Sequence, residues 1–382
     1  MKKYLIILLL IFLLLGCASS DYNAIIQAGM SKNPSAAFEH FARNKSVYYI
    51  RHPKQLQSDI KFLTAFIKNI SKSWGKENVV IPQKKEYVKY LQNYKSRALI
   101  DFTKGTVRVE TLGDKKNLKQ SIVTTLLLPD DPRSVDLFGA KNVKLGGTPY
   151  LFGEVKDDMG KNIRYQWRAN RYANILMKNN YKTTTIKRNG KSVKMSYVEF
   201  PMVHDHVNIR IAKFKPLVKK YARKYDISEN LVYAIIKTES DFNQFAVSGS
   251  GAYGLMQIMP KTAGRDAYLH VKGKKHTPSK TYLFNAKNNI ELGVAYLHIL
   301  NKEYLGGIYN SVSREYCVIS AYNTGSGNVL KVFNNDRNRA KKVINKLTPK
   351  SVYTKLRHKL PYVETRNYLK KVVRAKKEFV HI

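Results

Sequence analysis

An acidic residue on the apolar side of a predicted helix is the first feature of this sequence that points to chemistry. Glu239 closes the segment "ISENLVYAIIKTES", in which apolar residues recur at helical spacing. The residues that mark this buried face are Leu231, Val232, Ile235 and Ile236. Glu239 follows Ile235 by four positions, so its side chain shares the buried face. Burial disfavours the charged form of a carboxyl group, and a buried glutamic acid is therefore suited to hold a proton and donate it.

A single carboxyl group at such a position limits the reaction it can catalyse. General acid–base chemistry often divides the work between two groups, one acid and one base. Asp241 is a poor partner because it is predicted to project from roughly the opposite face of the helix. One carboxyl group would then serve as acid and afterwards as base, which is feasible where the substrate supplies its own nucleophile. The alternative is a structural Glu239 that pairs with a lysine or arginine.

Three further motifs follow Glu239 in order along the chain. They are the loop "AVSGSGAYG", the run "GLMQIMP" from Gly254 to Pro260, and "AYN" at 321–323. Together with Glu239 and Ser240, these motifs resemble the catalytic domain of the lytic murein transglycosylases, the goose-lysozyme-like SLT family. Flanking segments resemble the membrane-bound C branch of that family along nearly the whole mature chain. These segments are "WGKENVVIPQKKEYVKY", "LLLPDDPRSVDLFG", "YLGGIYN" and "ETRNYL".

The resemblance implies a reaction and a set of site residues. Glu239 would be the sole acid and base, and six further residues would surround the substrate: Ser248, Gln257, Met259, Tyr322, Asn323 and Tyr368. The reaction would cleave the β-1,4 bond between N-acetylmuramic acid and N-acetylglucosamine and close a 1,6-anhydro ring, with no cofactor or metal. Two residues depart from the family pattern. Gln244 stands where many members have proline, and Thr324 stands where glycine usually follows "AYN", so the loops at these positions could differ in conformation from those of the family.

Structural roles remain open for several of these residues. Tyr322, Tyr368 and Met259 could be core residues, and Ser248 could be a turn residue. Three other function classes also remain: a lysozyme-type hydrolase of the same fold, a murein-binding scaffold without turnover, and a nucleic-acid-binding protein. Glu239 argues against the scaffold.

The N-terminus indicates export and lipidation. Lys2 and Lys3 precede an apolar run too short to span a bilayer comfortably, which is the anatomy of a signal peptide over residues 1–16. "LLGC" resembles a lipobox, so we expect cleavage before Cys17 and acyl chains on that residue; a chance cysteine after an ordinary signal peptide is the alternative. Ala18 stands where an aspartate would signal inner-membrane retention. We therefore expect an anchor in the outer membrane that faces the periplasm.

The chain is strongly basic. The 68 Lys and Arg against 27 Asp and Glu give a net charge of +41, which makes a polyanion the first partner to consider. The cations are spread along the chain, and an exported protein has little access to nucleic acid, so we expect no nucleic-acid partner. Murein carries carboxylates that such a surface would hold. After Cys17, only Cys317 remains, and its apolar neighbours predict a buried thiol without a disulfide.

The predicted secondary structure changes along the chain and divides it into three regions. We expect a tether over 17–51, an α+β domain over 52–205, and an all-α lysozyme-like domain over 206–382. In the α+β domain, helices are predicted at 58–75 and from 117 to about Pro129, and hairpins around Gly105 and Gly190. In the all-α domain, Asp226 with Glu229 resembles a capping box for the Glu239 helix, and 254–268 is predicted to be helical. Trp74 and Trp167 could bind sugar, although core packing is the commoner role of tryptophan.

Overall fold

The computed structural model describes residues 17–37 and 53–380. The chain divides into two compact units, residues 1–206 with 247–251 and residues 207–246 with 252–382. The predicted signal peptide, and residues 38–51 of the predicted tether, lie outside the described residues. Among the described residues, no helix is long and apolar enough to cross a membrane.

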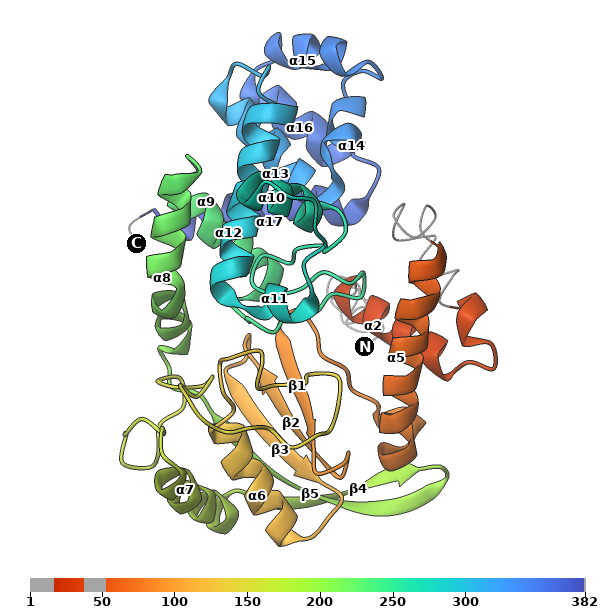
Figure 1. Cartoon of the computed structure of the whole chain (residues 1–382), viewed down its shortest axis with the longest axis vertical. Coiled ribbons are helices and arrows are strands. Elements are labelled where there is room, and N and C mark those ends of the chain that lie inside the picture. Colours follow the sequence, from red (N-terminus) through yellow and green to blue (C-terminus); the bar gives the residue numbers. More distant parts are fainter. Residues whose placement is uncertain (1–16, 38–52, 381–382) are drawn as a thin grey trace, which may run out of the picture. The chain divides into compact units, whose positions relative to one another are not determined.

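The N-terminal unit is built on a five-stranded antiparallel sheet in the order β1-β2-β3-β5-β4 (Figure 1). The strands are β1 (Glu86–Leu91), β2 (Ser96–Asp101), β3 (Thr106–Thr111), β4 (Tyr181–Arg188) and β5 (Lys191–Pro201). Both predicted hairpins are confirmed, because β2 pairs with β3 and β4 pairs with β5. Strand β1 is an addition to the predicted elements. Its Tyr87 and Val88 are both buried although they point to opposite faces, so the sequence lacks the alternation that marks a half-buried strand.

Helices pack against this sheet. They are α2 (Cys17–Met30), α5 (Pro53–Trp74), the short 3-10 helix η1 (Lys76–Asn78), α6 (Lys115–Leu126) and α7 (Gln166–Asn179). As predicted, α5 ends before Gly75, which adopts a positive φ of 82°, and α6 ends before Pro129. Helices α6 and α7 both contact the sheet, α6 at its centre and α7 at strands β4 and β5.

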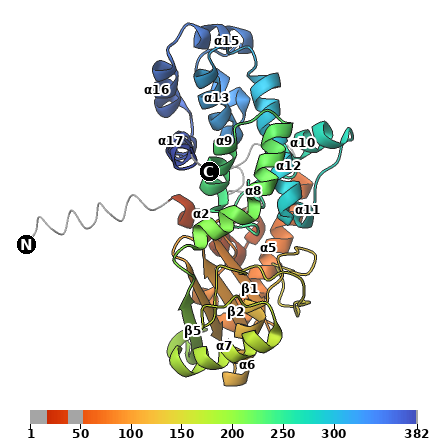
Figure 2. The same ribbon diagram turned by 90° about the vertical axis from the view of Figure 1, so that its left-hand side faces the viewer.

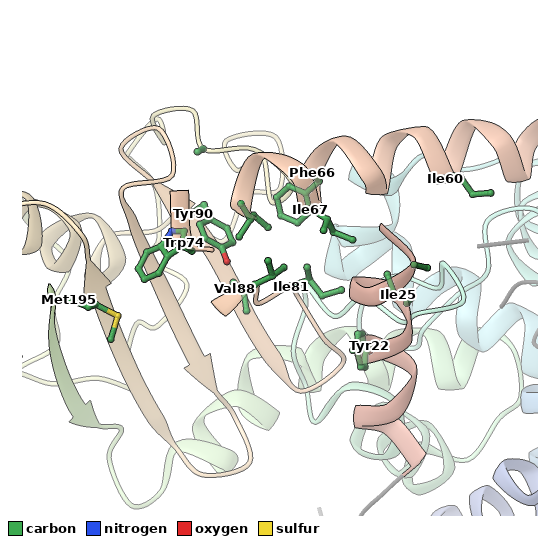
Figure 3. Close-up of a cluster of buried hydrophobic side chains, with 14 residues drawn as sticks. Tyr22, Ile25, Ile60, Phe66, Ile67, Trp74, Ile81, Val88, Tyr90 and Met195 are labelled. Carbon is green, nitrogen blue, oxygen red and sulfur yellow. The ribbon is translucent and has the colours of Figure 1, made fainter. Parts of the chain in front are cut away.

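A hydrophobic cluster joins α2 and α5 to the sheet (Figure 3). Tyr22 and Ile25 of α2 are buried in it beside Ile67 of α5 and Val88 of β1. The predicted tether therefore needs correction over α2, since this helix is part of the packed core. Trp74 is fully buried in the same cluster, donates from its indole N–H to the Tyr94 carbonyl at 2.8 Å, and is excluded as a sugar-binding residue.

The C-terminal unit is helical, as predicted. Its elements are α8 (His206–Lys224), α9 (Glu229–Ser240), α10 (Ala263–Lys272), α11 (Lys280–Phe284), α12 (Ala286–His298), the π-helix η2 (Ile299–Tyr304), α13 (Ser311–Thr324), α14 (Ser326–Lys331), α15 (Arg337–Asn345), α16 (Pro349–Lys359) and α17 (Val363–Glu378). Helix α17 packs on both α9 and α13 (Figures 1 and 2).

Two local predictions in this unit are wrong. The N-cap of α9 is Ser228, while Asp226 lies before the helix with a positive φ of 52° and pairs with Lys302 at 2.9 Å. The helix predicted over 254–268 begins only at Ala263, and the preceding residues form a loop. The loop conformation follows from Gly254 and Gln257, which both have positive φ values that a helix excludes.

Candidate active site

Glu239 lies in the last turn of α9 and is buried, with 5% of its surface exposed. The four apolar residues that marked the predicted face are buried, and so are Tyr233 and Ala234 between them, so α9 is covered on more than one face. Ser240 ties the end of this helix to the loop that follows, because its Oγ donates to the Leu255 carbonyl at 2.8 Å. Asp241 is the C-cap residue in a left-handed conformation and is therefore not on a face of the helix.

Two tyrosine hydroxyl groups, from Tyr322 of α13 and Tyr368 of α17, interact with the Glu239 carboxyl group. Burial raises the pKa of Tyr368 well above its usual value, and the charges of Glu239 and Tyr322 raise it further. Burial also raises the pKa of Tyr322, with smaller contributions from Glu239 and Tyr296. Both phenols therefore keep their protons at neutral pH, and the site presents neutral hydroxyl groups to the carboxyl group.

The two hydroxyl groups differ in what they contact. The Tyr322 hydroxyl donates to the Met256 carbonyl at 2.8 Å and so holds the loop. The Tyr368 hydroxyl is buried and has no hydrogen-bond partner among the described residues. The Glu239 carboxyl group is nevertheless close enough to raise the pKa of this phenol, by its charge and as a hydrogen-bonding neighbour. A protonated phenol in this position can donate a hydrogen bond to the ionised form of the carboxyl group.

Asn289 of α12 fixes the loop that contains Gln257. This side chain is fully buried, accepts from the Met256 N–H at 2.8 Å, and donates to the carbonyls of Tyr253 and Leu283 at 2.9 and 2.7 Å. The loop approaches so closely that a Cβ on Gly254 would lie 2.3 Å from the Leu283 carbonyl oxygen. Only glycine fits there, because Gly254 also has a positive φ of 79°.

Gln257 carries the second unsatisfied polar atom of the site. Its Nε2 donates to the carbonyls of Ala246 and Gly254 at 3.1 and 3.0 Å, which fixes the orientation of the amide. Its Oε1 is buried and has no partner among the residues that the structure describes. The backbone is left-handed, with a φ of 47°, which is uncommon for a residue other than glycine. A rigid acceptor of this kind is suited to bind an N–H group of a ligand.

The contacts of Asn323 and Met259 join parts of the fold to one another. The Asn323 Oδ1 accepts from the hydroxyl of Thr365 at 2.6 Å, and this contact joins α13 to α17 near Tyr322 and Tyr368. Met259 is half-buried at the end of the loop, and its carbonyl accepts from the Gly264 N–H at 2.9 Å.

Ser248 lies in a segment that belongs to the N-terminal unit. Residues 247–251 group with that unit, whereas Ala246 and Ala252 on either side belong to the C-terminal unit. Val247 is held there by two hydrogen bonds, from its N–H to the Gln83 carbonyl at 3.4 Å and to its carbonyl from the Tyr22 hydroxyl at 2.7 Å. The placement of Ser248 beside the substrate stays a prediction.

Within the C-terminal unit, the structure brings Glu239, Tyr322 and Tyr368 together and connects Gln257 to them through the Met256 carbonyl. Asn289 and Thr365 were missed by the sequence analysis. Thr365 precedes Tyr368 by three residues in "ETRNYL" and so shares its helix face, which is a signal that could have been used. Asn289 gave no such signal, since a polar residue in a helix usually faces solvent.

The arrangement can transfer protons to and from a bound sugar. It offers one buried carboxyl group, neutral phenols beside it, and an amide oxygen that can accept a hydrogen bond. A group of this kind can protonate a leaving oxygen and later take a proton from an attacking hydroxyl.

Comparisons with known families match both units. Residues 49–213 match the model described as the N-terminal domain of membrane-bound lytic murein transglycosylase C, and residues 216–345 match the transglycosylase SLT domain.

Curated relatives match over most of their length. Proteins described as membrane-bound lytic murein transglycosylase C from Yersinia pestis (strain Pestoides F) and Yersinia pseudotuberculosis serotype O:1b (strain IP 31758) are both 44% identical over 318 residues, which is 82% of this chain and 87% of theirs. Among solved structures, the 70 kDa soluble lytic transglycosylase Slt70 from Escherichia coli is 25% identical and covers 45% of this chain and 25% of that chain, with a TM-score of 0.34.

Proposed function

Because the chain belongs to the family of membrane-bound lytic murein transglycosylases C, we propose that Glu239 is the one acid and base of its reaction. The chain is an enzyme, a lytic murein transglycosylase that degrades peptidoglycan. The observation that supports the proposal is the buried Glu239 carboxyl group, which interacts with the neutral phenols of Tyr322 and Tyr368.

The proposed reaction proceeds in two proton transfers. Protonated Glu239 donates to the oxygen that links N-acetylmuramic acid to N-acetylglucosamine, and the bond from that oxygen to C1 breaks. The acetamide of the muramoyl residue stabilises the positive charge that develops at C1, as in substrate-assisted glycoside cleavage. Ionised Glu239 then takes the proton of the C6 hydroxyl, whose oxygen bonds to C1. The product is 1,6-anhydro-N-acetylmuramic acid, and no water is consumed.

The surrounding residues have separate roles in this proposal. The Tyr368 hydroxyl donates a hydrogen bond to the carboxylate that forms on Glu239, which is the state the first step creates. The buried Oε1 of Gln257 accepts from an N–H of a substrate acetamide. Tyr322 holds the Met256 carbonyl and thereby the loop, and Asn323 holds α17 in place through Thr365. Ser248 and Met259 contact the sugars beside the scissile bond.

We further propose that acyl chains on Cys17 anchor the enzyme in the outer membrane, with both units in the periplasm. The sequence "LLGC" at residues 14–17 supports the modification, and the relatives carry the description membrane-bound. Two or more acyl chains give stable anchoring, because each buried methylene contributes about 0.8 kcal/mol.

The catalytic proposal is tested by the products from purified sacculi. Wild-type enzyme is expected to release muropeptides that are one water lighter than those of a hydrolase, and Glu239→Gln is expected to release none. Circular dichroism of the variant serves as the folding control. Release of material by a folded Glu239→Gln variant at the wild-type rate would contradict the role of Glu239, and products of hydrolysed mass would instead support a lysozyme-type reaction.

A further inference from the structure

Exposed apolar side chains are concentrated in one short part of the N-terminal unit. Met159, Tyr165 and Trp167 expose 62%, 61% and 59% of their surface. Single exposed apolar residues are common, but an exposed tryptophan within two residues of an exposed tyrosine is a feature of binding surfaces. Trp167 thus differs from Trp74 of the same unit, which is fully buried.

Buried residues hold this region in a defined conformation. Ile163 and Ala169, on either side of the two aromatic residues, are 2% and 0% exposed and anchor the segment in the core. The Asp157 Oδ1 accepts from the backbone N–H groups of Met159 and Lys161 at 3.0 and 2.8 Å, which shapes the turn between them.

The same aspartate positions the tryptophan. Its Oδ2 accepts from Arg168 at 2.5 Å, and the Arg168 guanidinium lies over the Trp167 ring, 4.5 Å from its centre. The guanidinium lies over one face of the indole ring, and 59% of the Trp167 surface is still exposed. The ring is therefore held in place before any ligand binds, which reduces the entropy cost of binding.

Cations without carboxylate partners accompany the aromatic residues. Lys161 and Arg164 are exposed, and neither forms an ion pair within the part of the chain that the structure describes. By contrast, Arg168 and Arg171 are paired with Asp157 and Asp158. Residues 159–167 thus carry exposed aromatic side chains together with cations that have no carboxylate partner, and the Arg164 guanidinium lies over the Phe152 ring at 5.9 Å. We call Met159, Lys161, Arg164, Tyr165 and Trp167 the α7 patch.

We propose that the α7 patch is a second murein-binding site, separate from the catalytic residues, that stacks a sugar ring on Trp167 and pairs Lys161 and Arg164 with carboxylates of the same strand. The proposal rests on murein being the substrate of the catalytic unit. A sugar ring has an apolar face that packs on an aromatic ring, and its rim carries hydrogen-bonding groups. Murein adds the carboxylates of its peptide stems, which match the unpaired cations.

A lipid surface is the other occupant to consider, since tryptophan, tyrosine and lysine also gather at membrane interfaces. The composition of the patch favours murein. Membrane-inserting surfaces carry protruding leucine, isoleucine or phenylalanine side chains, and the only aliphatic-like member here is Met159.

The proposal is tested by co-sedimentation with purified sacculi. All proteins carry Glu239→Gln so that the polymer is not degraded, and Trp167→Ala is compared with Tyr309→Ala, which removes an 81% exposed aromatic residue of the C-terminal unit. Trp167→Ala is expected to weaken binding at least threefold and Tyr309→Ala to leave it unchanged. Lys161→Gln with Arg164→Gln is expected to weaken binding in low salt and to have little effect in high salt.

Two further arms identify the occupant. Sacculi whose carboxylates have been converted to neutral amides are expected to keep the Trp167 effect and lose the Lys161 and Arg164 effect. Vesicles of phosphatidylethanolamine and phosphatidylglycerol are expected to show no difference between the variants. Equal sacculus binding by Trp167→Ala and its parent would overturn the proposal, as would a loss of vesicle binding alone. The release assay on Glu239→Gln reports on the catalytic proposal separately, so the two failures are distinguishable.

Discussion

Glu239 lies in the last turn of α9, and the phenols of Tyr322 and Tyr368 are among its polar neighbours. The pKa of Tyr368 and that of Tyr322 are both raised by burial and by the Glu239 charge. A protonated phenol beside the carboxyl group can stabilise the carboxylate once the proton has left. This explains how one residue could serve as acid and base in turn.

Tyr368→Phe tests this contribution. We expect the rate of muropeptide release to fall by about tenfold or more, because a buried donor to a charge that develops in the reaction is lost. Tyr233→Phe is the matched control, since its hydroxyl is also buried without a partner among the described residues, and its ring packs 5.3 Å from that of Phe379. Equal rates for the two variants would argue against a catalytic contribution from Tyr368.

Lys89 provides a second test at the residue scale, one of stability. Burial lowers the pKa of Lys89 to about 8, although Asp136 acts in the opposite direction, and the ammonium donates to the Gly139 carbonyl at 2.7 Å. Below pH 8 both folded and unfolded chains hold this proton, and the folded state bears the cost of a buried charge. Between pH 8 and the unfolded lysine value of about 10.5, only the unfolded chain keeps the proton, so this cost disappears and stability rises.

The measurement is urea unfolding of wild type and Lys89→Met across this range. The difference in unfolding free energy between the two proteins is expected to shift in favour of wild type by roughly 3 kcal/mol from pH 7 to 10.5. The contributions of the other titrating groups are the same in both proteins and therefore cancel in this difference. A difference that does not change with pH would show that the pKa of Lys89 is not lowered in the folded protein.

At the scale of elements, the loop that contains Gln257 shows where sequence patterns stop being informative. Periodicity predicted a helix over 254–268, but Asn289 takes up the Met256 N–H and the carbonyls of Tyr253 and Leu283. Asn289 belongs to a helix more than thirty residues further along the sequence, and no local sequence pattern predicts its contacts with the loop. By contrast, the hairpins around Gly105 and Gly190 were predictable, because turn glycines between alternating segments are local signals.

Gly254→Ala tests the fit of this loop. We expect a loss of roughly 3 kcal/mol or more in unfolding free energy, because the new methyl group would meet the Leu283 carbonyl oxygen at 2.3 Å and the φ of 79° is unfavourable. Gly273→Ala separates the two causes, since Gly273 also has a positive φ, of 67°, but has no atom within 4 Å of the added carbon.

The control is expected to cost only about 1–2 kcal/mol, the backbone share of the effect. Thermal or urea unfolding measures both variants. Comparable losses in the two variants would mean that the close approach between Gly254 and the Leu283 carbonyl of α11 does not contribute to the loss of stability.

At the scale of the whole molecule, the sequence indicated a mixed unit followed by a helical one, and the structure and the family matches confirm that fold class. Two features exceed what the sequence could show. Helix α2 contributes Tyr22 and Ile25 to the core of the N-terminal unit, although the surrounding segment looked like a tether. Residues 247–251 belong to the N-terminal unit while their chain neighbours belong to the other. Both depend on contacts between segments far apart in sequence.

The central claim is that the substrate supplies the nucleophile and that Glu239 moves every proton. Digestion of purified sacculi in water enriched in oxygen-18, followed by mass spectrometry of the muropeptides, tests it most directly. We predict that the new muramoyl ends carry no heavy oxygen, because the C6 oxygen of the sugar closes the ring. Incorporation of one heavy oxygen at each new end would contradict the account and identify the enzyme as a hydrolase.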